Sequence, residues 1–228
     1  MKKILVLAVF MLGSTVFAQT NTELSKHFQA FYKKMKSQGD IQGTINALTH
    51  LDLLEPSQAK KDTLAYLYLS EGMNLQALNT IGIEKNEADS NIAVEVKALA
   101  LKAIGENKRA IEHFEVMFNR KPNALIAYEL ADLKTQTSDL AGAKTHIEYG
   151  LANAREDQMR GFFETQTPYQ VPVKAAFLYL KALITFNEDQ TNNLDASIAL
   201  LDQALQIEPN FNMASISKDA LVAKKPKE

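Results

Sequence analysis

The sequence predicts an all-α protein, a right-handed α-solenoid of antiparallel helix pairs. One observation is a period of 33 residues in its small residues, at Gly39, Gly72, Gly105 and Ser138 and again at Thr44, Ala77, Ala110 and Ala143. The other is the recurrence of apolar residues at intervals of three and four from Thr22 onward, the spacing of one helix face. Such a period is typical of a solenoid, in which stacking supplies the core that no repeat can bury alone.

We expect five repeats, each with two helices of about a dozen residues. A glycine at the turn between the two helices permits a positive φ without strain. The solenoid is expected to span residues 19–209, with repeats at about 25–56, 58–89, 91–122, 123–151 and 175–209. Pro56, Pro122 and Pro209 end three of these repeats, because proline cannot continue a helix interior.

The second repeat has an unusual ending. Glu84 and Asp89 stand where other repeats place an apolar residue and a proline. We therefore expect a longer, solvated turn before the third repeat begins.

The period breaks after the fourth repeat. The next small residue in register, Ser197, follows Ala143 by 54 residues instead of 33. Most of the excess lies in an insertion at about 152–173. We expect Met159, Phe162 and Phe163 to prolong the preceding helix until the proline-containing stretch at 168–172 ends it.

The two ends of the chain are expected to differ from the repeats. Residues 1–18 have two lysines, a short apolar run and a Val16-Phe17-Ala18 site, which predicts a cleaved signal peptide and a periplasmic or secreted protein. The alternative, a membrane anchor, is disfavoured because the run is short for ~30 Å of hydrocarbon. Residues 210–223 are expected to form a capping helix, followed by a basic tail at 224–228.

These residues resemble the tetratricopeptide repeat (TPR) family, whose pattern is W-x2-L-G-x2-Y, then A-x3-F, then P. The third repeat matches it with Ala98-x2-Leu101, Ala110-x3-Phe114 and Pro122. Neighbouring repeats match in part, with Leu64-Ala65-x2-Tyr68, Ala77-x3-Ile81, Leu130-Ala131 and Ala143-x3-Ile147. The sequence departs from the pattern in having no tryptophan, in Lys97 at a usual leucine position, and in a period one residue short.

No pattern in the sequence indicates catalysis, a metal or a cofactor. There is no cysteine, and none of the four histidines has metal-ligand spacing. His113 and His146 occupy equivalent places in successive repeats, where we expect them to be solvated. Since repeats occupy nearly the whole chain, we expect a non-enzymatic protein.

The resemblance implies that the first helix of each repeat lines a groove that holds an extended peptide or a partner's helix. Carrying the family's groove positions onto this sequence gives Lys33, Lys36, Tyr66, Leu69, Glu95, Leu99, Lys102, Tyr128, Asp132, Tyr179, Leu183 and Phe186. Tyrosines and leucines there would act as anchors, with charges providing selection. The alternative is that several of them pack between helices.

The insertion is a second candidate binding site. Its aromatic and basic residues would form a patch of Arg155, Arg160, Phe162, Phe163 and Tyr169. The alternative is that Phe162 and Phe163 fold back to fill a gap in the stacking.

We therefore expect an exported interaction module or scaffold whose partner is a protein or peptide. A net charge of −2 gives no general attraction for nucleic acid, and no stable membrane insertion is expected after signal cleavage. The second hypothesis is a small-ligand-binding protein, in which the insertion closes over an oligosaccharide or peptide.

Overall fold

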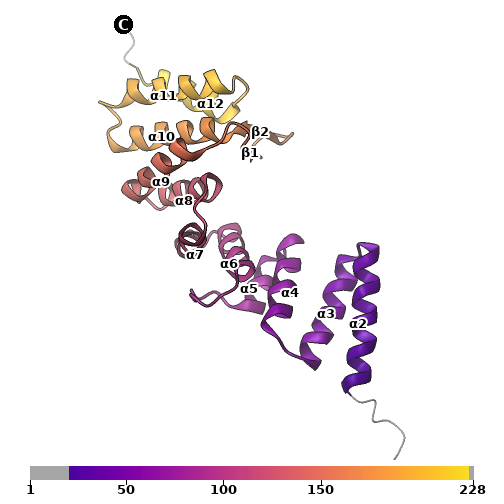
Figure 1. Cartoon of the computed structure of the whole chain (residues 1–228). Helices are drawn as coiled ribbons and strands as arrows, with labels where there is room; N and C mark the ends of the chain where they lie inside the picture. The colour runs from indigo at the N-terminus through magenta and orange to yellow at the C-terminus, as the bar shows by residue number, and fades with distance from the viewer. Residues whose placement is uncertain (1–20, 226–228) are drawn as a thin grey trace, which may run out of the picture. The chain divides into compact units, whose positions relative to one another are not determined.

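A computed structural model of the protein describes residues 21–225, which form eleven helices and one β-hairpin (Figure 1). The predicted signal peptide and the last three residues of the basic tail lie outside the described residues. The chain divides into two compact units, one ending at Gly82 and one beginning at Ile83.

The first unit contains two helix pairs. Its helices are α2 (Asn21–Gln38), α3 (Ile41–Leu54), α4 (Gln58–Ser70) and α5 (Asn74–Ile81). Each pair packs along its length, and α3 also packs on α4. Ile45, Leu48 and Leu64 form a buried cluster with Tyr32 and Tyr68 at its margin. The predicted helical periodicity therefore places apolar residues where α3 meets α4.

The second unit contains three helix pairs and a final helix. Its helices are α6 (Asn91–Ala103), α7 (Asn107–Arg120), α8 (Ala124–Gln136), α9 (Leu140–Asn153), α10 (Val173–Glu188), α11 (Leu194–Ile207) and α12 (Asn212–Val222). The core gathers around α10, in which Phe177 and Ile184 are almost fully buried. Phe211 and Ala214, at the start of α12, close this core from the C-terminal side.

The 33-residue period corresponds to one repeated turn. Gly39, Gly72 and Gly105 have φ values of 70°, 71° and 82°, and Ser138 has a φ of 65°. At each turn the next residue's N–H donates to a carbonyl five residues back, as from Glu106 to Leu101 at 2.9 Å. This is the Schellman geometry, which ends a helix with a left-handed residue. The period is therefore set by backbone conformation as well as by packing.

The small residues five positions further on are fully enclosed. Ala77, Ala110 and Ala143 are each 0% exposed, and Ser197 is equally buried. Each lies in the second helix of a pair, where two helices approach closely and a larger side chain would overpack the contact.

The insertion is a β-hairpin, so the prediction that it prolongs the preceding helix is wrong. Strand β1 (Met159–Phe162) pairs antiparallel with β2 (Tyr169–Pro172), and Arg160 lies opposite Val171. Alternate residues point to opposite faces of a strand. Phe162 and the fully buried Val171 therefore face the core, while Met159 points outward and is exposed.

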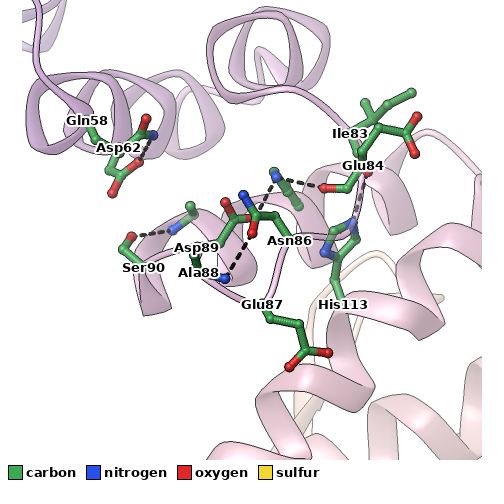
Figure 2. A network of polar contacts seen from close by, with 12 residues as sticks. Gln58, Asp62, Ile83, Glu84, Asn86, Glu87, Ala88, Asp89, Ser90 and His113 are labelled. Atoms are coloured by element: carbon green, nitrogen blue, oxygen red, sulfur yellow. Dashed lines mark hydrogen bonds and ion pairs between the residues drawn. The ribbon is translucent and has the colours of Figure 1, made fainter.

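The turn between α5 and α6 is long and mostly exposed, as predicted, and buried side chains of α6 and α7 hold it through polar contacts (Figure 2). Lys97 of α6 is buried, and its Nζ lies 2.6 Å from Asp89 Oδ2 and 2.9 Å from the Glu84 carbonyl. His113 Nε2 lies 3.0 Å from the Ile83 carbonyl. A buried charge is tolerated when it is paired and hydrogen-bonded.

The prediction that His113 and His146 are solvated is also wrong. His113 is 1% exposed, and burial lowers its pKa. His146 is half-buried, with its ring 5.0 Å from that of Phe118, and burial likewise lowers its pKa.

We predict that Ser138→Gly stabilises the protein. A left-handed conformation costs a non-glycine residue about 1 kcal/mol, and glycine adopts it freely. Chemical denaturation should show an increase of about this size in the free energy of unfolding. The reverse change, Gly105→Ser at the equivalent turn, should lower stability by a similar amount. Equal stability of Ser138→Gly and the unaltered protein would contradict this account of the period.

Candidate partner-binding groove

A groove of about 660 Å³ lies between α6, α7, α8 and the hairpin, all within the second unit. Its lining combines apolar and charged side chains: Glu95, Leu99, Lys102, Phe114, Met117, Leu125, Ile126, Glu129, Met159, Arg160, Phe163 and Gln170, with Gly161. Leu125, Met159 and Phe163 are exposed large apolar residues. The groove therefore offers accessible apolar surface beside fixed charges, a combination typical of binding sites.

A neighbouring cavity of about 340 Å³ shares Glu95, Met117 and Ile126 with the groove. It extends toward Arg120 and Lys121, at the end of α7. Arg120 is held there by Asn91 and by the Glu87 carbonyl, each at 2.9 Å. The shared residues make the two cavities one continuous surface along α6 and the start of α8.

Arg160 fastens the hairpin to α8. Its guanidinium lies 2.6 Å from Glu129 Oε1 and 3.9 Å from the centre of the Tyr128 ring. Lys102 of α6 binds the other carboxylate oxygen of Glu129. Glu129 therefore joins α6, α8 and β1, and the stacked guanidinium covers Tyr128. An ion pair and a cation–π contact to one arginine are both strengthened by partial burial.

The electrostatics of this cluster follow from its burial and its charges. Burial disfavours the ionised form of Glu129, but Arg160 and Lys102 outweigh it and hold the pKa of Glu129 below its ordinary value. Burial raises the pKa of the Tyr128 hydroxyl, and Arg160 opposes this shift only in part. At neutral pH the cluster contains two cations, one anion and a neutral tyrosine.

The structure places three of the predicted groove residues in the groove. Glu95 and Leu99 lie along α6, and Lys102 lies near its end. Asp132, one turn after Tyr128 on α8, is half-buried and does not line it.

Two of the predicted anchors are not available to a partner. Tyr128 is 2% exposed, beneath Arg160, and Tyr179 is 7% exposed, with its ring 5.3 Å from that of Phe211. Leu183 and Phe186 are half-buried and pack against the core. Arg160 of the hairpin covers Tyr128 of α8, and Phe211 at the start of α12 covers Tyr179 of α10. In a regular array without these segments, both tyrosines would be accessible.

The other predicted groove residues belong to the first unit. Lys33 and Lys36 are exposed on α2, with the Lys36 Nζ 5.9 Å from the centre of the Tyr32 ring. On α4, Tyr66 is exposed and Leu69 is half-buried.

The predicted patch in the insertion divides into separate roles. Phe162 packs between Tyr169 and Phe211, with ring centres 5.7 and 4.9 Å away, so it fills the core as the alternative expected. Phe163 does not fold back, since it is 77% exposed at the groove. Arg155 is exposed and pairs with Asp157 at 2.9 Å, away from the groove lining.

Glu129, Leu125 and Met159 are among the groove residues that the sequence did not indicate. On a helix, Glu129 resembles an ordinary solvated carboxylate. Its role depends on Arg160, which is 31 positions away and reaches α8 only because the insertion is a hairpin. An arginine within the mainly apolar run 159–163 was the available signal, because such a side chain needs a carboxylate partner when buried.

Residues 21–225 contain no group of three or more histidine, aspartate and glutamate side chains placed to hold a metal ion. Within the same range, no helix combines the length and apolar character needed to cross a bilayer.

Neither a protein-family model nor a curated protein matches the sequence. The fold is similar to solved TPR structures. YrrB, described as a TPR protein with an unusual peptide-binding site, aligns with a TM-score of 0.65 and 11% identity over 89% of this chain and 100% of YrrB. MamA from Desulfovibrio magneticus RS-1 aligns with a TM-score of 0.61 and 12% identity over 82% of this chain and 97% of that one.

Cut9, in the Cut9–Hcn1 complex, aligns with a TM-score of 0.52 and 16% identity over 93% of this chain and 38% of that one. Together these similarities confirm the predicted fold class, an all-α solenoid of antiparallel helix pairs of the TPR type.

We predict that Glu129→Gln loosens the hairpin and lowers stability at neutral pH by about 1–3 kcal/mol, since Arg160 and Lys102 lose a charged partner. Because the folded state lowers the pKa of Glu129, its ionic contribution is present above the ordinary value of 4.5 and is lost as the pH falls through the lowered pKa. The difference between variant and unaltered protein should therefore shrink in acid.

Denaturation at several pH values measures this difference, and hydrogen exchange at 159–172 reports on the hairpin. Glu95→Gln is the matched control, because Glu95 lines the same groove and forms no ion pair within residues 21–225. A loss of stability that is the same at every pH would contradict the assigned role of Glu129.

Proposed function

We propose, from the premise that the chain has the fold of TPR proteins, that it is a non-enzymatic module that binds a segment of a partner protein. The observation that carries this proposal is the groove of the second unit, which α6, α7, α8 and the hairpin line. Its exposed leucine, methionine and phenylalanine side chains provide apolar contact area, and its charges provide selectivity.

The structural neighbours support the same class of function. YrrB is described as having a peptide-binding site, and Cut9 was solved in a complex with Hcn1. By analogy, the helical array here serves as a rigid support on which the groove is built. Fold analogy alone does not specify a ligand, so the proposal depends on the groove's own residues.

The second hypothesis, a small ligand enclosed by the insertion, has less support. It requires a compact pocket beneath Phe162 and Tyr169. In the structure these two rings stack on each other, and Phe162 also contacts Phe211. The rings fill the space that a ligand would need. An open groove on the other face of the hairpin suits a peptide better.

Site-specific photo-cross-linking tests the groove as the partner site. A photoreactive residue at Leu125 or Phe163 should cross-link to one and the same partner in extracts of the source cells, because both positions line the groove. Ile216, an exposed apolar position on α12, is the matched control and should give no such product. A partner that cross-links equally from Ile216 would contradict the groove proposal.

We further propose that the module acts after export, on the basis of the signal-like residues 1–18. N-terminal sequencing of the protein from the source cells tests this. The expected mature chain begins at Gln19, after cleavage at the small residue Ala18. A chain that retains Met1 and stays in the cytoplasm would overturn this part of the proposal.

A further inference from the structure

The hairpin leaves one edge of β1 without a partner strand. The Val173 N–H donates to the Gln158 carbonyl at 2.9 Å, immediately before β1. Antiparallel pairs alternate between hydrogen-bonded and non-hydrogen-bonded positions. Met159, opposite Pro172, and Gly161 therefore direct their backbone N–H and C=O groups away from β2. Within residues 21–225, no other backbone segment hydrogen-bonds to these groups.

This free edge borders the groove. Three consecutive residues of β1, Met159, Arg160 and Gly161, line it, whereas β2 contributes Gln170. Arg160 also holds β1 in place through its ion pair with Glu129. An edge strand that is fixed and accessible is a ready template for another extended chain.

The groove beside this edge suits the side chains of an extended peptide. Leu99 of α6, with Leu125 and Ile126 of α8, supplies an apolar surface, and Phe163 stands exposed at the rim. Successive side chains of a strand point to opposite sides. A peptide paired with β1 would therefore place every second side chain against this apolar surface and the others on its opposite side, within reach of the field of the charges that line the groove.

The charges along the groove favour an acidic ligand. The joined cavities are lined by four cationic and two anionic side chains: Lys102, Arg120, Lys121 and Arg160, with Glu95 and Glu129. Lys102 and Arg160 share the single carboxylate of Glu129. The lining is thus net positive on a chain whose formal net charge is −2.

We infer that β1 is a docking edge for an extended acidic segment of a partner protein, with apolar residues at alternate positions, which adds to the hairpin as a third strand. This inference rests on the proposed function and specifies how the groove holds its ligand. Main-chain hydrogen bonds supply affinity in this mode, and alternate side chains supply specificity.

Fluorescence anisotropy with the full chain tests the ligand class. The probe is a labelled peptide of about eight residues that alternates glutamate and valine, a length within the usual range of strands. It should bind, and its affinity should fall as salt rises. An alternating lysine–valine peptide should bind at least about tenfold more weakly. Equal or tighter binding of the lysine peptide would overturn the assignment of an acidic ligand.

A pair of substitutions at Gly161 tests the pairing edge. Gly161→Pro removes the outward N–H, and proline is tolerated on an edge strand at such a position. It should weaken binding of the glutamate–valine peptide by about tenfold. Gly161→Ala is the matched control and should bind normally. It keeps the N–H, and its Cβ would lie 3.1 Å from the Phe163 ring, which is exposed and free to move. Unchanged binding by the proline variant would overturn the inference.

N-methylated probes test the same edge on the unaltered protein. Two glutamate–valine peptides, methylated at opposite sets of alternate amides, should differ in affinity, because only one set faces β1. Equal affinities would overturn strand addition.

The cross-linking assay separates this inference from the proposed function. If Gly161→Pro still cross-links the partner normally from Phe163, the groove function stands and strand addition fails. If neither Leu125 nor Phe163 of the unaltered protein captures a partner, both fail.

Discussion

The contact of Arg160 with Glu129 and Tyr128 is the interaction on which the groove depends. Without it, the hairpin would be held by the core-facing Phe162 and Val171 and by the hydrogen bonds of Glu164 and Tyr169 to the start of α12. With it, β1 is bound to α8, and through the shared carboxylate to Lys102 of α6. Two helices of successive repeats and the inserted hairpin thereby meet at one side chain. Such a network is stable because each charge has a partner, whereas a partly satisfied one would be costly.

A second buried charge shows how the array tolerates a departure from its own pattern. Lys97 stands where the TPR pattern has a leucine, in the tightly packed first helix of a pair. Its ammonium reaches Asp89 and the Glu84 carbonyl, so the lengthened turn after α5 supplies the oxygens that its burial requires. The unusual residue in the helix and the unusual turn are thus one feature. Either Lys97 or Asp89 without the other would be destabilising, because removing one partner of a buried ion pair leaves an uncompensated charge.

The sequence predicted well the parts of the fold that depend on local chemistry. The 33-residue period marked left-handed turns, and Ser138 could be placed among the glycines because their spacing was regular. The small residues typified by Ala110 marked the close helix contacts. These features repeat, so each occurrence supports the others, and a single weak match does not decide the result.

Prediction failed where an outcome depended on contacts distant in sequence. The insertion occurs once, so no period identified it as a hairpin. The prolonged-helix prediction treated Phe162 and Phe163 alike, yet strand alternation sends one into the core and the other into solvent. The family pattern likewise indicated Tyr128 and Tyr179 as anchors, because it describes a regular array without a covering segment. The accessible apolar residues of the groove are instead Leu125, at the start of α8, and Met159 and Phe163, at the two ends of β1.

This covering has a consequence for the size of a ligand. In a regular array, the first helices offer a continuous surface along several repeats. Here the hairpin and α12 cover Tyr179 of α10, and Arg160 of the hairpin covers Tyr128 of α8, which leaves α6, the start of α8 and the groove side of the hairpin. A surface shortened in this way contacts fewer ligand residues, so each must contribute more to affinity. Main-chain hydrogen bonds to a fixed strand provide such a contribution in a short length of chain, because every second ligand residue can make two of them. The same hairpin that closes one part of the array therefore compensates, at its free edge, for the surface it covers.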